Sequence, residues 1–226
     1  MGAGELDDSA RAALSEVLAL LAVERASVSS VTDPERAWRV HVDDSLSGLA
    51  VAPLAEAGRI ADIGSGAGFP GLPLAVALRD GAELDLIESV GRKCDFIRRA
   101  ARSAGIANVT VVQARSEEVA AGAGRESYDA VTARAVGRVS TLAELASPLL
   151  RDGGVLVAWK GRRDEEEEAE LDRAAEGLAM RPVEILAVGP FAGSRHRHLH
   201  VIEKAGPTPA GLPRRAGMAK KRPPGS

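Results

Sequence analysis

The stretch Arg59-Ile-Ala-Asp-Ile-Gly-Ser-Gly-Ala-Gly-Phe-Pro-Gly-Leu-Pro73 decides how this chain folds. Ile60–Ile63 is a short apolar run of the kind that forms a buried strand. Glycines follow at alternate positions, and glycine reaches backbone angles that other residues avoid and lets a ligand approach the main chain closely. Pro70 suits the first turn of a helix. The stretch therefore predicts a strand, a glycine loop and a helix, which together open a nucleotide-binding α/β unit.

The glycine loop is compatible with two ligands. Gly66-Ala-Gly68-Phe-Pro-Gly71 fits G-x-G-x-x-G, the dinucleotide fingerprint. In a second register, Asp62-Ile-Gly64-Ser-Gly66-Ala-Gly68 resembles the first motif of S-adenosylmethionine-dependent methyltransferases, in which the loop packs around the methionine and ribose of the cofactor. A tight turn without a ligand is a third interpretation, although four glycines weaken a fold unless something requires them.

An acidic residue ends the next predicted strand, Glu83-Leu-Asp-Leu-Ile-Glu88. A carboxylate at this position can accept hydrogen bonds from both ribose hydroxyls of an adenosine ligand. Glu88 therefore favours an adenosine-containing ligand without separating the two cofactors, and a solvated charge at a strand end is the alternative.

Apolar runs and intervening helical patterns continue along the chain. They predict about seven strands, at residues 60–63, 83–88, 109–112, 128–133, 155–159, 183–188 and 198–203. Strands that alternate with helices indicate an α/β fold with a doubly wound, mostly parallel sheet and helices on both faces. We expect a helical N-terminal cap over residues 6–54, the sheet domain over residues 55–204, and a basic, disordered tail over residues 205–226.

Composition limits the classes of protein to consider. The chain has 226 residues, 45% of them hydrophobic, and a net charge of −3, which suits one soluble domain and does not single out a nucleic-acid binder. Cys94 is the only cysteine, so the sequence encodes no disulfide framework. No apolar run is long enough to span a membrane, and we expect a cytoplasmic location. His196, His198 and His200 alternate, which is too little to predict a metal site.

Several further segments resemble one family, the ribosomal RNA small subunit methyltransferase G family, also called glucose-inhibited division protein B. They are Arg39-Val-His-Val-Asp-Asp-Ser-Leu46, Asp62-Ile-Gly-Ser-Gly-Ala-Gly-Phe-Pro-Gly71, Glu88-Ser-Val-Gly-Arg-Lys93, Arg115-Ser-Glu117, Thr132-Ala-Arg-Ala135 and Trp159-Lys-Gly161. The resemblance covers roughly residues 6–204. Ser27-Val-Ser29 departs from the resemblance. The family often has Asn-Leu-Thr at this place, shortly before the helix that we predict to begin at Asp33-Pro34.

The resemblance implies a Rossmann-like class I methyltransferase fold and transfer of a methyl group from S-adenosylmethionine to N7 of one guanine in 16S ribosomal RNA. The implied substrate is that RNA or the small ribosomal subunit, and we expect a monomer. The residues that would contact the cofactor are Asp62, Gly64, Gly66, Gly68, Phe69, Ser116, Glu117 and Arg134, with Glu88 on its ribose.

This chemistry requires no catalytic base, since guanine N7 carries a free lone pair and no proton. The reaction needs alignment of N7, the methyl carbon and sulfur. Arg115 and Arg134 are candidates to orient the guanine, through O6 or a phosphate because N7 must stay free. The alternative for both arginines is a structural ion pair.

Two other functions remain open on the residues alone. An NAD-dependent oxidoreductase would use the glycines of G-x-G-x-x-G, although no Tyr/Lys or His pair that would handle a hydride is evident. A non-enzymatic RNA-binding protein would use the basic tail, which carries Arg214, Arg215, Lys220, Lys221 and Arg222. We expect such a tail to add phosphate contacts without affecting a cofactor site.

Overall fold

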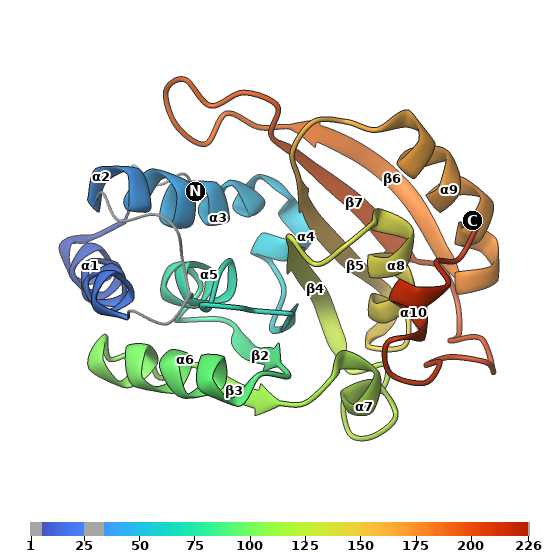
Figure 1. The fold of residues 1–226 in the computed structure, drawn as a ribbon, viewed down its shortest axis with the longest axis horizontal. Coiled ribbons are helices and arrows are strands. Elements are labelled where there is room, and N and C mark those ends of the chain that lie inside the picture. Colours follow the sequence, from blue (N-terminus) through green and yellow to red (C-terminus); the bar gives the residue numbers. More distant parts are fainter. Residues whose placement is uncertain (1–5, 25–33, 226) are drawn as a thin grey trace.

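The structure, a computed structural model, describes residues 6–24 and 34–225. Its centre is a seven-stranded sheet in the order β3-β2-β1-β4-β5-β7-β6, in which β7 pairs antiparallel with β5 and β6 (Figure 1). The strands are β1 (Arg59–Ile63), β2 (Glu83–Glu88), β3 (Val109–Gln113), β4 (Tyr128–Arg134), β5 (Leu150–Lys160), β6 (Met180–Ala187) and β7 (His198–Lys204). The predicted mostly parallel sheet is thereby confirmed.

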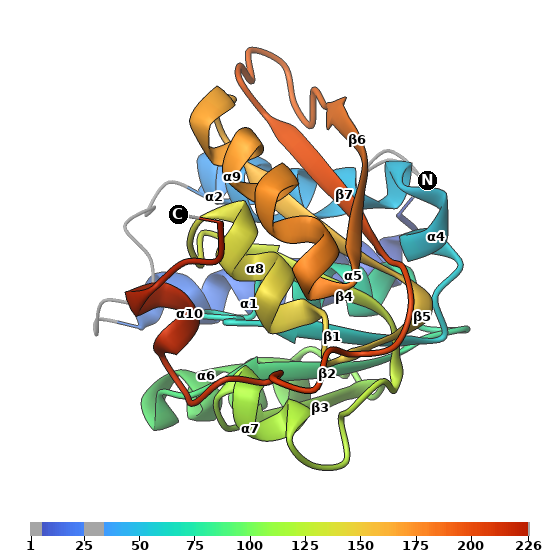
Figure 2. The same cartoon turned by 90° about the vertical axis from the view of Figure 1, so that its right-hand side faces the viewer.

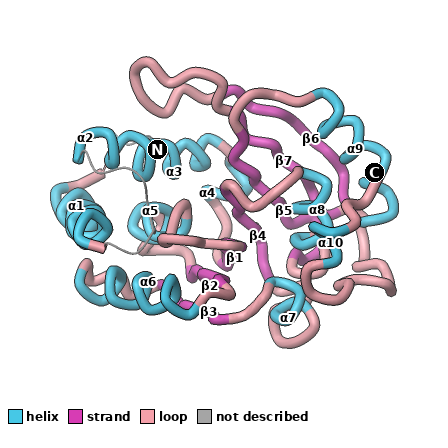
Figure 3. Tube along the Cα trace, in the orientation of Figure 1, coloured by secondary structure: helices cyan, strands magenta, loops and turns pink. Residues whose placement is uncertain are grey.

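Helices cover both faces of the sheet (Figures 1 and 3). One face carries α1 (Asp8–Val23), α5 (Gly71–Ala77), α6 (Gly91–Ser103) and the short helices of residues 34–55. The other face carries α7 (Ser116–Ala120), α8 (Val139–Ala146), α9 (Glu165–Ala175) and α10 (Met218–Lys221). A view along the other direction shows α8 and α9 side by side in front of the sheet (Figure 2).

Alternation along the strands divides the core in two. Ile60 packs in the core under α1, α5 and α6, whereas Ala61 and Ile63 pack in the core under α8 and α9. A parallel strand buried on both faces is apolar at nearly every position, which explains why these strands appear in the sequence as continuous apolar runs. None of the helices in the described ranges is long and apolar enough to cross a bilayer.

The N-terminal segment is fastened to the end of β5. Residues 34–55 form α2 (Pro34–Ala37), a π-helical turn (Trp38–Asp43), α3 (Asp44–Leu46), a 3-10 turn (Ser47–Ala50) and α4 (Ala52–Ala55). Trp159 Nε1 donates a hydrogen bond of 2.8 Å to the main-chain oxygen of Asp44. The Trp159 ring lies against Gly48, where an added Cβ would come within 2.3 Å of it. Ser27-Val-Ser29 lies outside the described residues.

The C-terminal segment differs from the expected disordered tail. Residues 205–225 run back over the sheet domain and end in α10, which packs on α8 (Figure 2). Arg214 forms an ion pair with Glu144, a glutamate of α8 that is only 3% exposed. Composition misled the prediction because a proline- and glycine-rich segment can still be ordered by contacts with a folded domain.

The contact between Gly48 and Trp159 yields a stability prediction. Gly48→Ala forces the indole to move, and overpacking of this kind costs about 1–3 kcal/mol. Gly81→Ala is the matched control, because a Cβ there meets no atom within 4 Å. Chemical denaturation should show a clear loss of unfolding free energy for Gly48→Ala and a change within about 0.5 kcal/mol for Gly81→Ala. Equal stability of the two variants would contradict the tight contact.

Candidate functional site

Asp62 holds the glycine loop in place from inside the protein. Its side chain is completely buried. Oδ2 accepts the Gly71 N–H at 3.2 Å, and Oδ1 accepts the Thr132 hydroxyl at 2.9 Å. Burial raises the pKa of Asp62 to about 6, although these donors and the charge of Arg134 oppose the rise. Asp62 therefore joins β1, β4 and the start of α5, and it supports the loop instead of facing a cavity.

Glu88 holds the same loop from the neighbouring strand. Oε2 accepts the Gly66 N–H at 3.1 Å, and Oε1 accepts the Val90 N–H at 2.9 Å. Lys93 Nζ lies 3.7 Å from Oε2. The side chain is only 6% exposed, yet it lines a cavity at the carboxyl end of the sheet. Glu88 thus combines a structural role with an accessible carboxylate edge.

That cavity, which we call the glycine-loop cavity, measures about 660 Å³. It lies at the carboxyl ends of β1, β2 and β3, where open α/β sheets bind ligands. Its size is within the range of pockets that hold small ligands. The predicted site residues that line it are Gly64, Glu88, Arg115, Ser116 and Glu117, and the C-terminal segment contributes Gly217, Ala219, Lys220 and Lys221.

A second cavity of about 380 Å³ lies on the other side of the loop between β4 and α8. Its walls include His41, Asp44, Arg134, Trp159, Lys160, Arg197 and His198. We call it the cationic cavity because Arg134, Lys160 and Arg197 carry positive charges. Arg134 Nη1 donates to Asp44 Oδ2 at 2.9 Å and to the Val40 oxygen at 3.1 Å. Arg197 Nε is 3.4 Å from the other Asp44 oxygen. A single buried carboxylate thereby fixes two arginines at one opening.

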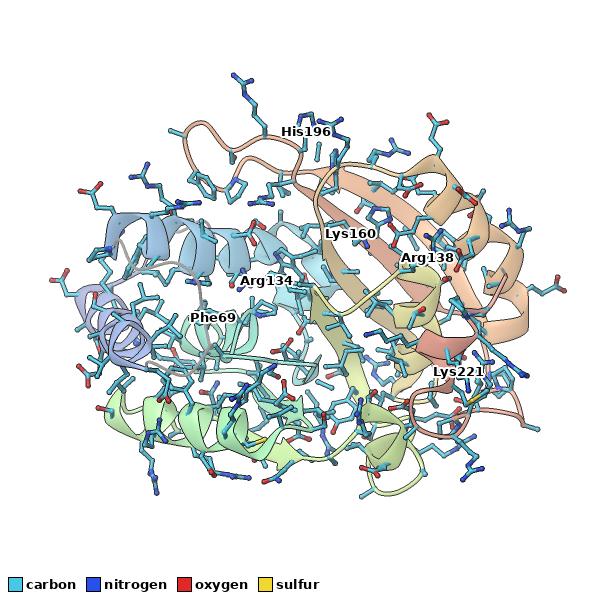
Figure 4. The ribbon with its side chains drawn as sticks, in the orientation of Figure 1. Phe69, Arg134, Arg138, Lys160, His196 and Lys221 are labelled. Carbon is cyan, nitrogen blue, oxygen red and sulfur yellow. The ribbon has the colours of Figure 1, made fainter. Side chains whose placement is uncertain are left out.

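Phe69, His41 and Arg134 form a stack beside the cationic cavity. Phe69 and Arg134 are labelled in Figure 4. The Phe69 and His41 rings lie 4.6 Å apart at 27°, and the Arg134 guanidinium is 5.7 Å from the Phe69 ring. Burial, together with the charge of Arg134, lowers the pKa of His41 to about 4. His41 is therefore neutral at physiological pH, and the stack connects the glycine loop to the N-terminal helices.

The loop of residues 135–138, which we call the dividing loop, separates the two cavities. Val136 lines the glycine-loop cavity, whereas Ala135 and Gly137 line the cationic cavity. Gly64 makes this arrangement possible, because a Cβ there would lie 2.8 Å from a Val136 methyl group and its φ is +67°. The glycine loop and the dividing loop are thus packed directly against each other.

Two glutamates of α9 fix the dividing loop. Glu167 Oε1 accepts the Val139 N–H at 2.6 Å and Lys160 Nζ at 2.7 Å, and the same Nζ donates to the Gly137 oxygen at 3.0 Å. Glu170 Oε2 accepts Arg138 Nε at 2.7 Å. Asp164 caps α9 by accepting the amides of Glu166 and Glu167. Glu167 and Glu170 are three residues apart, and this spacing in the sequence indicates that they share one face of the helix.

The structure divides the predicted site residues between two places. Arg115 lines the glycine-loop cavity and Arg134 lines the cationic cavity, so the structure does not bring together the two arginines that are candidates to orient the guanine. Phe69 is buried beside Arg134, while Gly66 and Gly68 shape the loop from outside the lining of the glycine-loop cavity. Asp44, Trp159, Lys160 and Arg197 were not predicted, although three of them fall in segments that carried the family resemblance. Among residues 6–24 and 34–225, no group of three potential metal ligands occurs.

Comparisons with known proteins agree with this geometry. The family model GidB, rRNA small subunit methyltransferase G, matches residues 13–199. The chain is 46% identical over 210 residues to the Ribosomal RNA small subunit methyltransferase G of Rubrobacter xylanophilus, covering 91% of this chain and 80% of that protein. It is 42% identical over 213 residues to the protein of the same name from Deinococcus radiodurans, covering 92% of this chain and 83% of that one.

Solved structures with low sequence identity share the fold. A 1,6-didemethyltoxoflavin-N1-methyltransferase from Burkholderia thailandensis, with bound S-adenosylhomocysteine, superposes with a TM-score of 0.56 at 20% identity, covering 84% of this chain and 90% of that one. A fibrillarin pre-rRNA processing protein from Methanococcus jannaschii gives a TM-score of 0.56 at 18% identity, covering 73% and 74% of the two chains.

The lowered pKa of His41 leads to a prediction about stability. A histidine whose pKa is about 4 when folded and 6.5 when unfolded adds stability as the pH rises between these values, because the unfolded chain binds more protons there. The unfolding free energy of the wild type minus that of His41→Phe should rise by at most about 3 kcal/mol from pH 4 to 6.5 and then level off.

Asp62 has the opposite effect, because its raised pKa makes the protein less stable as the pH rises from about 4 to 6. Both proteins contain Asp62, so its contribution cancels in the difference between them. Urea denaturation at a series of pH values provides the measurement. A difference that does not change with pH would mean that His41 titrates normally.

Proposed function

We propose that this chain transfers a methyl group from S-adenosylmethionine to guanine N7 of small-subunit ribosomal RNA, since it belongs to the GidB family, rRNA small subunit methyltransferase G. The observation that carries the proposal is the pair of cavities on the two sides of one loop. One has a glycine loop and the carboxylate of Glu88, as an adenosine cofactor requires, and the other has the cations Arg134, Lys160 and Arg197, as RNA requires.

The glycine-loop cavity fits the cofactor. Gly64 presents bare main chain, and Glu88 presents a carboxylate edge that can accept hydrogen bonds from ribose hydroxyls. Ser116 and Glu117, at the start of α7, form the opposite wall and would hold the adenine end. S-adenosylmethionine supplies an electrophilic methyl group on a sulfonium centre. The residues that line this cavity, Val136 of the dividing loop among them, would hold the cofactor in a fixed position.

The cationic cavity fits a guanine nucleotide. Arg134, Lys160 and Arg197 provide donors for phosphate or for guanine O6. The neutral His41 adds an aromatic ring without adding charge. Guanine N7 needs no deprotonation, so the task of these residues is to hold the base with N7 directed at the methyl group of the cofactor.

The two alternative functions account for less. An oxidoreductase of the NAD type would leave the cationic cavity without a role. A non-enzymatic RNA-binding protein would leave the glycine loop and its two supporting carboxylates unexplained. The deciding experiment incubates the protein with labelled S-adenosylmethionine and small subunits from a strain that lacks this gene, then maps methylated guanines by chain cleavage specific for N7. Methylation at an atom other than guanine N7, or no methylation of subunits that are otherwise active, would reject the proposal.

Glu88→Ala tests the cofactor site. The change removes the ribose acceptor, and it also leaves the Gly66 and Val90 amides without their acceptor, which costs about 1–3 kcal/mol for each buried group. We therefore expect weaker binding of S-adenosylmethionine together with a lower melting temperature. Glu83→Ala, at the exposed start of the same strand, is the control and should change neither. Calorimetry in which Glu88→Ala binds the cofactor normally would rule out the ribose contact.

Arg197→Gln tests the cationic cavity. The side chain lines the cavity and is 38% exposed, so it can donate to RNA. Loss of one charge-assisted contact should lower kcat/KM for small subunits roughly tenfold, chiefly through KM, with cofactor affinity unchanged. Arg195→Gln removes the same charge two residues away, outside the cavity lining, and should behave like the wild type. If both variants lost activity equally, the effect would come from general surface charge.

A further inference from the structure

The C-terminal segment forms part of the wall of the glycine-loop cavity. Gly217, Ala219, Lys220 and Lys221 line it together with Glu88 and Glu117. The Gly217 N–H donates to Glu117 Oε1 at 2.7 Å. Lys221 lies on this segment at the side of the molecule that carries α8 (Figure 4). Residues distant in sequence from the glycine loop therefore share its cavity.

Contacts with the domain hold the segment along its whole length. At its start, Lys204 Nζ donates to the Ser147 oxygen at 2.6 Å and to the Thr208 hydroxyl at 2.8 Å. In its middle, the guanidinium of Arg214 forms two hydrogen bonds with the buried Glu144. Near its end, the Thr141 hydroxyl donates to the Ala219 oxygen at 3.3 Å. Ala219 itself is only 2% exposed.

The turn at Gly217 places α10 beside the cavity. Gly217 has φ +81°, a conformation that favours glycine, and it directs the chain from the Arg214 anchor into α10. Its amide then faces the Glu117 carboxylate. The methyl side of Ala219 packs toward α8 while the exposed Lys220 and Lys221 border the cavity. The Lys204 and Arg214 anchors lie outside the cavity lining, so they can hold the segment in place whether or not a ligand is bound.

We infer that residues 205–225 act as a strap that completes the cofactor site and slows release of the cofactor. This inference rests on the proposed function, because it concerns the same cavity. The strap adds the cationic side chains of Lys220 and Lys221 to a cavity that already has Arg115 and the carboxylates of Glu88 and Glu117, so the completed cavity offers several groups of each sign of charge. An amino-acid moiety with an ammonium and a carboxylate group matches such a cavity better than either sign alone would.

A strap and a free basic tail predict different results when the segment is deleted. A free basic tail would affect only RNA binding, whereas a strap must also affect the cofactor. Arg214 is tied to α8 by its ion pair with the buried Glu144. The remaining basic residues form two pairs, Lys220 with Lys221 inside the cavity lining and Arg215 with Arg222 outside it. These two pairs allow a matched comparison within a single segment.

The experiment uses the full-length chain and a variant that ends at Arg215, which keeps the Arg214–Glu144 pair and so preserves the fold. Calorimetry with S-adenosylhomocysteine should show a Kd about tenfold higher for the truncated protein, or ~1.4 kcal/mol. Stopped-flow displacement should show faster release, and thermal melting without ligand checks the fold. In the full-length protein, amide exchange at Gly217 should slow when the ligand binds.

Two double variants refine the result. Lys220→Ala with Lys221→Ala should raise the Kd to a smaller extent, whereas Arg215→Ala with Arg222→Ala should leave it unchanged. If the truncated protein binds as tightly as the full-length chain, or more tightly, the strap is not part of the cofactor site. Failure of the full-length chain to bind either form of the cofactor would instead reject the proposed function, so the two failures are distinguishable.

Discussion

The hydrogen bonds of one buried carboxylate are the constraint on which the site depends. Asp62 is fully buried and must find donors inside the protein, since an unpaired carboxylate there would be very unfavourable. Its donors are the amide of Gly71 and the hydroxyl of Thr132, so the loop, α5 and β4 can meet in only one way. Gly71 must be glycine for this contact, because a Cβ would lie 2.9 Å from both Asp62 Oδ2 and a Leu86 carbon. Burial raises the pKa of Asp62 to about 6, which shows that these donors only partly offset its loss of water.

From that fixed loop the rest of the site follows by direct contact. Val136 packs against Gly64, and this contact sets the position of the dividing loop. Glu167 and Glu170 hold the same loop from α9, on the opposite side. Arg134, at the end of β4, then reaches the N-terminal helices through Asp44. The two cavities have different linings because a loop supported from both sides lies between them. A change in α9, far along the chain from the glycine loop, would thus be felt in both cavities.

The sequence predicted those features that depend on local patterns. Apolar runs located the strands because parallel strands are buried on both faces, and the glycine spacing located the loop. Glu88 was predicted to line the cavity because the end of the second strand is a fixed point of this fold. The cationic cavity could not be predicted from spacing, since Asp44, Arg134 and Arg197 come from three distant segments that only tertiary packing brings together. Arg115 and Arg134 looked equivalent because each follows a strand, but β3 and β4 are separated by β2 and β1 in the sheet, which places the two arginines in different cavities.

The carboxylates of the site share a feature that fits a reaction without a base. Asp62, Glu88, Glu117 and Glu167 each accept a main-chain N–H, from Gly71, Gly66 and Val90, Gly217, and Val139 respectively. A carboxylate engaged in this way positions backbone and is poorly suited to take a proton from a substrate. Transfer to guanine N7 removes no proton, and its rate depends on alignment of the acceptor with the methyl group and sulfur. Acidic side chains that fix loops therefore serve this chemistry directly, because each loop they hold sets the position of one of the two reactants.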